Sequence, residues 1–128
     1  MDEEYISKKV IADFNLAKDE LDTAMILFNS YKYRQSVTHS YYAMFQAATA
    51  LLTKKNLVAK SHEGLIMLFG REYIKTGIFD KHVFGFLTKA RTERKDGSYD
   101  SFAIFSEEDA HSILEEAEIF IQEAEKLI

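Results

Sequence analysis

Proline is absent from the 128 residues of the chain, and only five positions are glycine. Proline breaks the interior of a helix and glycine weakens it, so a chain with this composition can form long, uninterrupted helices. Thirteen alanines and eleven leucines against four valines also favour helices over strands. The absence of cysteine excludes a disulfide scaffold, a zinc finger and a thiol nucleophile. The sequence therefore predicts an all-α protein.

Apolar residues recur at steps of three and four along five segments, which is the pattern of one buried helix face. The segments run from about Glu4 to Ser30, from Arg34 to Thr53, from Ser61 through Tyr73, from Asp80 to just before Gly97, and from Ser106 to Ile128. The connections are short, so neighbouring helices should run antiparallel. We expect a single domain over residues 1–128, built as an antiparallel bundle of about five helices.

Several residues mark the expected helix ends. Ser61 is a good N-cap, and Ser106 with Asp109 resembles a capping box. Gly77 stands where a left-handed C-terminal cap would fall. Residues 96–105 are expected to form a polar, aromatic loop between the last two helices.

The helix over residues 34–53 is apolar around more of its girth than one core requires. Tyr41, Tyr42 and Phe45 are the surplus aromatic residues. Large apolar patches left on a monomer are a liability, so they favour contact with a second copy. We therefore expect a homodimer, with these three residues in the core or at the dimer interface.

The net charge of −5 is unevenly distributed along the chain, as −4 over residues 1–22, +6 over residues 23–106 and −7 over residues 107–128. Either the acidic end helices attract the basic middle within one fold, or a basic face attracts phosphates. No apolar run approaches the roughly 18 residues of a membrane span, and the acidic N-terminus lacks the apolar stretch of a signal peptide. We expect a cytoplasmic protein that does not bind a membrane.

Arg91 and Arg94 are the strongest candidates for a binding site. They continue the apolar stripe of the fourth helix, where an unpaired guanidinium would be costly. One interpretation pairs them with acids of the terminal helices, and the other places them in a cleft for a phosphate or carboxylate, which suits the planar fork of arginine. Tyr99, in the expected loop beside them, is a further candidate ligand.

A polar row on the second helix is the other candidate feature, formed by Gln35, His39, Tyr42 and Gln46 at steps of four, three and four. A satisfied network between helices is the favoured interpretation, and the wall of a cleft containing His39 is the alternative. His62 follows the Ser61 cap at the positive end of a helix, which favours the neutral imidazole. The four histidines share no ligand spacing, so we expect neither a metal site nor a cofactor.

Four stretches of the chain, read together, resemble one known family. The run YYAMFQAA over residues 41–48, followed by Leu51-Leu52, resembles the signature helix of HEPN domains, in which YYAMFHAA is common. The other three similar stretches are KSHEGL over residues 60–65, Phe69 with KTGIFD over residues 75–80, and Arg91 and Arg94 before Tyr99-Asp100. The resemblance covers roughly residues 5–125 in matching order.

This resemblance implies a helical bundle that usually forms dimers. Such proteins are commonly small and prokaryotic, and are encoded beside a minimal nucleotidyltransferase as a two-gene or toxin–antitoxin pair. Many HEPN domains are metal-independent ribonucleases with an R-x(4–6)-H motif. In that motif the histidine moves the proton of the 2′-hydroxyl and the arginine stabilises charge on the phosphate.

The sequence departs from the motif at the histidine. The positions counted from the two arginines hold Asp96, Gly97 and Ser98 or Tyr99, Asp100 and Ser101. We therefore expect a non-catalytic module that binds a nucleotide, RNA or a nucleotidyltransferase partner through an Arg91/Arg94 cleft. One alternative is an atypical ribonuclease toxin that uses Arg91 or Arg94 with His39 or Tyr99. A second alternative is a structural partner subunit whose arginines are paired internally.

Overall fold

The computed structural model describes residues 2–99 and 101–128, with side chains described for residues 2–94 and 101–128. This part of the chain contains five α-helices and no strand, as the composition predicts. The helices are α1 (Glu3–Asn29), α2 (Tyr33–Lys54), α3 (His62–Phe69), α4 (Lys81–Tyr99) and α5 (Glu107–Glu125), and a short π-helical segment, η1 (Gly70–Ile74), continues α3. None of these helices is both long and apolar enough to span a membrane.

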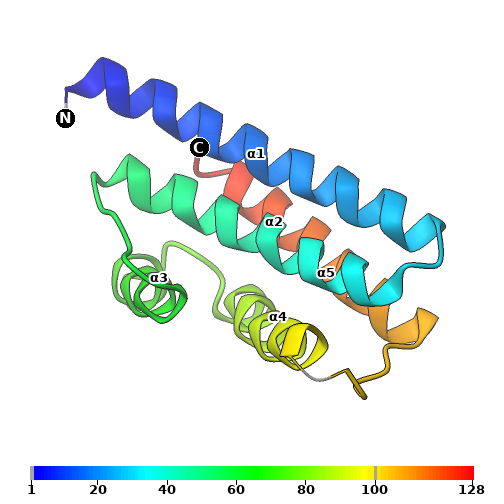
Figure 1. Cartoon of the computed structure of the whole chain (residues 1–128). Coiled ribbons are helices and arrows are strands. Elements are labelled where there is room, and N and C mark those ends of the chain that lie inside the picture. The colour runs from blue at the N-terminus through cyan, green and yellow to red at the C-terminus, as the bar shows by residue number, and fades with distance from the viewer. Residues whose placement is uncertain (1, 100) are drawn as a thin grey trace.

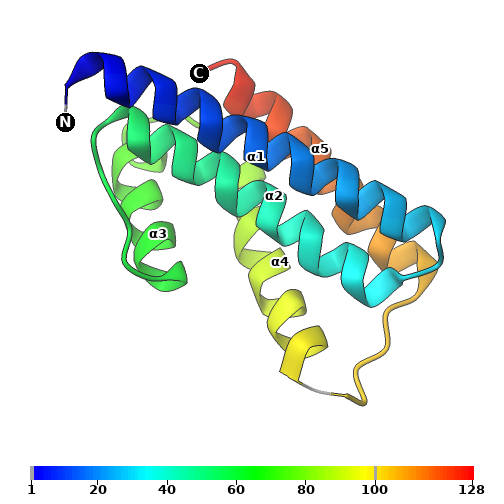
Figure 2. The ribbon, with the colours of Figure 1, turned by 45° about the horizontal axis from the view of Figure 1, so that its top comes forward.

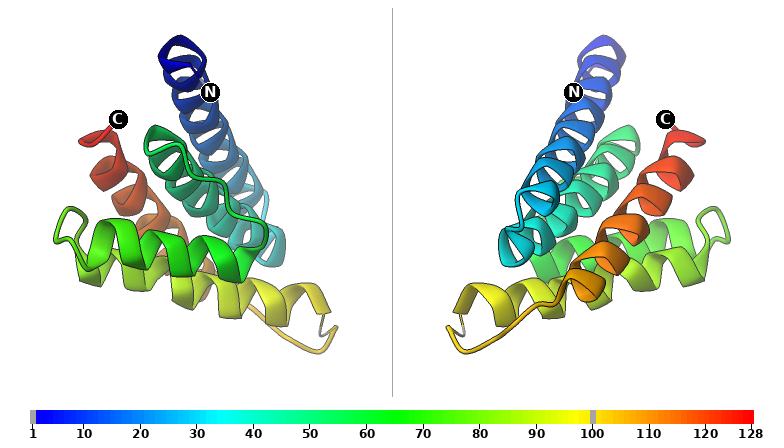
Figure 3. Two further views of the ribbon diagram at one scale, coloured as in Figure 1. Left: turned by 90° about the vertical axis from the view of Figure 1, so that its left-hand side faces the viewer. Right: turned by 90° about the vertical axis from the view of Figure 1, so that its right-hand side faces the viewer.

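The helices form two groups that cross each other. The three helices α1, α2 and α5 lie along a common direction, with α2 and α5 both antiparallel to α1 (Figure 1). The helices α3 and α4 cross this group steeply and run antiparallel to each other on one side of it (Figures 2 and 3). The antiparallel arrangement predicted from the short connections is therefore present within each group. The crossing between the groups is an additional feature, which helix periodicity alone does not indicate.

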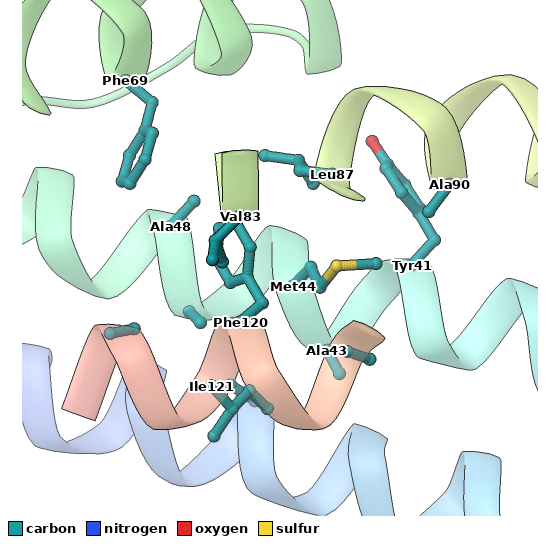
Figure 4. Close-up of a cluster of buried hydrophobic side chains, with 14 of the residues drawn as sticks. Tyr41, Ala43, Met44, Ala48, Phe69, Val83, Leu87, Ala90, Phe120 and Ile121 are labelled. Carbon is teal, nitrogen blue, oxygen red and sulfur yellow. The ribbon is translucent and has the colours of Figure 1, made fainter. Parts of the chain in front are cut away.

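The helix α2 is the centre of the fold, because it contacts each of the other four helices. Its small residues are completely buried, namely Ala43, Ala47, Ala48 and Ala50. Alanine allows neighbouring backbones to approach closely, so several helices can pack around one. Figure 4 shows the resulting core, in which side chains of α2 meet those of α3, α4 and α5: Tyr41, Met44, Phe69, Val83, Leu87 and Phe120.

The predicted helix ends at three positions are confirmed. The Ser61 hydroxyl accepts a hydrogen bond of 2.9 Å from the Gly64 N–H and so begins α3. Ser106 and Asp109 form the reciprocal capping box of α5, with hydrogen bonds of 3.0 and 3.3 Å. Gly77 has a φ of 75°, the left-handed conformation that glycine adopts without strain.

Two predicted boundaries differ from the structure. The α-helical part of the third segment ends at Phe69, and η1 follows, with the Lys75 N–H bonded to the Gly70 carbonyl at 2.9 Å. The fourth helix does not end before Gly97 but continues to Tyr99, so the predicted loop over residues 96–105 begins later than expected. One glycine costs a helix interior only about 1 kcal/mol relative to alanine, which is too little to end a helix by itself.

Candidate anion-binding site

Three elements bring the candidate residues together. The first is the middle of α2, the second is the start of α3, and the third is the C-terminal half of α4. Because α3 and α4 run antiparallel on the same side of α2, the beginning of α3 lies toward the second half of α4 (Figure 3). His62, the first residue of α3, thereby reaches the neighbourhood of Arg91 and Arg94.

Tyr41 and His62 form a hydrogen-bonded and stacked pair inside this site. The phenol oxygen of Tyr41 lies 2.6 Å from Nδ1 of His62, and the two rings are nearly parallel, with centroids 5.7 Å apart and an interplanar angle of 18°. Phe45 covers the imidazole from α2, with ring centroids 4.5 Å apart. The ring of Tyr41 reaches from α2 to α4 beside Ala90 (Figure 4). The pair is therefore part of the core and part of the site.

The surroundings favour the neutral form of both members of this pair. Burial raises the pKa of Tyr41 to about 12, although Arg91 and Arg94 oppose the shift. Burial also lowers the pKa of His62, and here the positive charges of Arg94 and Arg91 act in the same direction. The expectation of a neutral His62 rested on the helix terminus, whereas desolvation and the two arginines are the causes in the structure.

Arg94 lies against the two tyrosines of α2. Its Nη2 donates a hydrogen bond of 2.9 Å to the phenol oxygen of Tyr42. Its guanidinium carbon lies 5.3 Å from the centroid of the Tyr42 ring and 5.7 Å from that of the Tyr41 ring, within the range of cation–π attraction. These contacts fix the orientation of a planar group that is built to bind oxyanions.

Arg91 is paired more loosely. Its Nη2 lies 3.4 Å from Oε1 of Glu63, and the side chains are 28% and 77% exposed, respectively. A charge-assisted hydrogen bond is normally about 2.7–2.9 Å long, and an exposed ion pair contributes about 0–1 kcal/mol. The acid that contacts Arg91, Glu63, lies on α3. One interpretation of the sequence had instead paired Arg91 with an acid of a terminal helix.

His39 faces another side of α2. Its Nδ1 lies 2.6 Å from Oε2 of Glu20 on α1, and its ring meets the Tyr42 ring edge-on, with centroids 5.8 Å apart. Tyr42 thus separates His39 from Arg94 and links the two through ring contacts. At His39, the polar row predicted on α2 therefore forms a contact with α1.

The other candidate residues are placed as follows. Tyr41 has no exposed area, and Tyr42 and Phe45 are partly buried against the core, because α3 and α4 both pack on this side of α2. The surplus aromatic surface expected for a dimer contact is therefore smaller than predicted. The side chain of Tyr99 lies outside the described residues. His62 was not predicted to be in the site, although it lies in the KSHEGL stretch that resembles the HEPN family and was expected to be a neutral imidazole, because no pattern in the sequence connects it to Arg91 and Arg94.

The side chains of this arrangement have the chemistry that could hold an anion. Two guanidinium groups provide positive charge and hydrogen-bond donors, and one exposed carboxylate, that of Glu63, is the acid described beside Arg91. The neutral imidazole of His62 adds a group that can donate or accept a proton. Among the described residues, no three side chains with metal-binding chemistry are grouped together.

The lowered pKa of His62 predicts how stability depends on pH. The unfolded chain binds a proton at this residue near its ordinary value of 6.5, whereas the folded protein does so only at a lower pH. Protonation therefore favours unfolding, and the free energy of unfolding is expected to fall as the pH decreases below that value. Urea denaturation at several pH values between about 5 and 8 measures this dependence, and His62→Gln should show a flatter profile. Parallel profiles for the two proteins would contradict the prediction.

Comparisons with known proteins identify the family of the chain. The model of the HEPN domain family matches residues 14–127. Two proteins of Methanocaldococcus jannaschii that carry the name "Putative toxin" are 35% and 31% identical, covering 96% and 88% of this chain and 91% and 76% of their own. A UPF0332 protein of Thermotoga maritima is 35% identical, over 88% of this chain and 85% of its own. On the matched residues and on these identities, the chain belongs to the HEPN domain family.

Proposed function

We propose that this protein binds the phosphate groups of RNA or nucleotides through Arg91 and Arg94. The observation that supports the proposal is the position of the two guanidinium groups beside the neutral Tyr41–His62 pair. Arg94 is held in place by the tyrosine rings, and Arg91 has a long contact of 3.4 Å to an exposed carboxylate. A phosphate can replace that carboxylate at little cost, because an exposed pair of this kind is weak.

The biological setting that we propose is a toxin–antitoxin-type pair with a minimal nucleotidyltransferase as the protein partner. Two relatives carry the name "Putative toxin", and the sequence resembles the HEPN proteins that are found in such pairs. Expression together with the product of a neighbouring nucleotidyltransferase gene, followed by affinity purification, tests this pairing. Recovery of a stoichiometric complex is the expected result.

Substitution of the arginines tests the phosphate site. Arg91→Ala and Arg94→Ala are each expected to weaken binding of a labelled single-stranded RNA, and to reduce the slope of log affinity against log salt by about 0.7 for each phosphate contact that is lost. Fluorescence anisotropy measures both quantities. Arg91→Lys should bind less tightly than the unchanged protein, because an ammonium group lacks the arginine fork. Lys81→Ala removes an exposed cation at the start of the same helix and is the matched control.

Thermal melting of the same variants separates this role from a structural one. Arg91 is partly exposed, so Arg91→Ala is expected to lower the free energy of unfolding by less than about 1 kcal/mol. Breaking a buried ion pair costs about 3–5 kcal/mol. A loss of that size, together with unchanged RNA affinity, would reject the phosphate site and support the alternative of a structural subunit.

The position of His62 favours cleavage of RNA as a second candidate function. The sequence lacks the histidine of the R-x(4–6)-H motif, but the fold places another neutral imidazole beside both arginines. In such a reaction His62 would accept the proton of a 2′-hydroxyl. The 2′-oxygen would then attack the adjacent phosphorus and the bond to the 5′-oxygen would break, with the 5′-oxygen taking up a proton from solvent, leaving a 2′,3′-cyclic phosphate and a 5′-hydroxyl.

An RNA cleavage assay in the presence of a chelator decides between the two candidates. Binding without rapid cleavage is the result expected from the missing motif histidine, since general acid–base catalysis contributes about 10²–10⁴-fold. Rapid cleavage that His62→Gln abolishes while RNA binding is retained would instead establish the second function. Cleavage that persists in both His62→Gln and Arg94→Ala would indicate a contaminating nuclease.

We also propose that the protein is a homodimer, as the sequence suggested, but through a different surface. The α1–α2 turn and the segment before α5 line one common hollow. Tyr31 and Ile104 in this region are 79% and 90% exposed, which leaves apolar area uncovered in the single chain. Sedimentation at micromolar concentration is expected to give twice the chain mass, and Ile104→Asp to give the monomer. Ile11→Asp, at a 57% exposed position in the N-terminal half of α1, is the control, and a monomeric unchanged protein would reject the proposal.

A further inference from the structure

A groove on the outer face of α3 lies apart from the arginine site. It has a volume of about 710 Å³, and its walls come from the α2–α3 connection, α3, η1 and the start of α4. Its apolar lining consists of Val58, Ile66, Met67, Leu68, Ile74 and Phe84. Met67 is 75% exposed and Val58 is 72% exposed, so two large apolar side chains face solvent here. Figure 3 (left) shows α3 on the outside of the molecule.

Positive charges border this apolar surface. Lys60, Arg71 and Lys75 line the groove, and no acidic residue is among its described lining residues. Lys60 and Lys75 form no ion pair with any residue whose side chain is described, while Nε of Arg71 contacts Glu72 at 2.9 Å. The groove therefore combines uncovered apolar area with cations that are available to an external acid.

The spacing of the lining residues indicates the shape of the occupant. Gly64 and Met67 on α3, Arg71 on the π-helical η1 and Lys75 directly after it all line the groove, so the groove runs along the α3–η1 unit. The eight residues of α3 span about 12 Å at about 1.5 Å per residue, so with η1 the groove is about as long as three turns of a second helix, roughly 16 Å. A helix that docks in such a groove uses apolar residues at steps of three and four.

The charges decide between the possible partners. A symmetric contact with a second copy would place Lys60, Arg71 and Lys75 against the same three cations, which is unfavourable. Single-stranded nucleic acid is bound by cations along its backbone together with exposed aromatic rings on which its bases stack. The only aromatic residue described in the lining, Phe84, is half-buried, so the groove offers cations but no exposed ring for a base. We propose that this groove binds an acidic amphipathic helix of a partner protein.

Binding of designed peptides tests this proposal. The probe is a labelled peptide of about 15 residues, with leucine at helical steps of three and four and glutamate on both flanks, and the matched peptide has lysine in place of glutamate. Fluorescence anisotropy is expected to detect binding of the acidic peptide only. Met67→Asp should weaken it at least about tenfold, since it places a like charge and a polar group in the apolar floor. Ile26→Asp, on α1, is the control that should bind normally.

Charge reversal provides the sharper result. In the double variant Lys60→Glu and Lys75→Glu, the preference is expected to change from the acidic peptide to the lysine peptide. No binding of the acidic peptide, equal binding of both peptides, or unchanged binding to Met67→Asp would overturn the proposal. Displacement of the peptide by RNA or by anionic vesicles, or a change of sedimentation in Met67→Asp, would also overturn it by assigning the groove to another partner. RNA binding through Arg91 and Arg94 is expected to be normal in Met67→Asp, so the two proposals fail separately.

Discussion

Burial of most of α2 is the constraint on which the rest of the structure depends. A helix that contacts four others needs small residues where the other helices come close and large residues where gaps remain between them. In α2 the buried alanines are the small residues, and Tyr41 and Met44 are among the large ones. Apolar burial is worth about 25 cal/mol per Å², so this helix supplies a large share of the stability of the fold. The same packing brings α3 and α4 to one side of α2, where the candidate site is formed.

The site combines two requirements that usually conflict. Binding an anion needs concentrated positive charge, whereas a histidine that transfers protons must not be permanently charged. Here the charge is carried by the guanidinium groups of Arg91 and Arg94. The same two charges help to lower the pKa of His62 and so keep its imidazole neutral. The same electrostatic arrangement would therefore suit both the proposed phosphate binding and, in the second candidate function, proton transfer.

Much of the fold follows from local signals in the sequence, whereas the composition of the site does not. The period of apolar residues gives the five helices, and Ser61, Ser106 and Gly77 give their ends, because each signal acts within a few residues. Gly97 led to the prediction of a helix end that is absent, since the low helix propensity of one glycine does not outweigh the helix propensity of the residues around it. The proximity of His62 to Arg94, and of Glu63 to Arg91, depends on the angle at which α3 crosses α2, and that angle is set by packing among residues distant in sequence.

Because α3 is short, binding of a ligand would change how often this helix opens locally. This helix has eight residues, of which only Leu65 and Phe69 are buried, so it is held by few side chains. Elements of this kind open locally at a lower free-energy cost than the core, and their amide protons exchange sooner. An anion held between His62 on α3 and the arginines on α4 would join α3 to the rest of the molecule and slow that exchange. Part of the intrinsic affinity would then be used to suppress local opening, and the observed affinity would increase with any change that anchors α3 in advance.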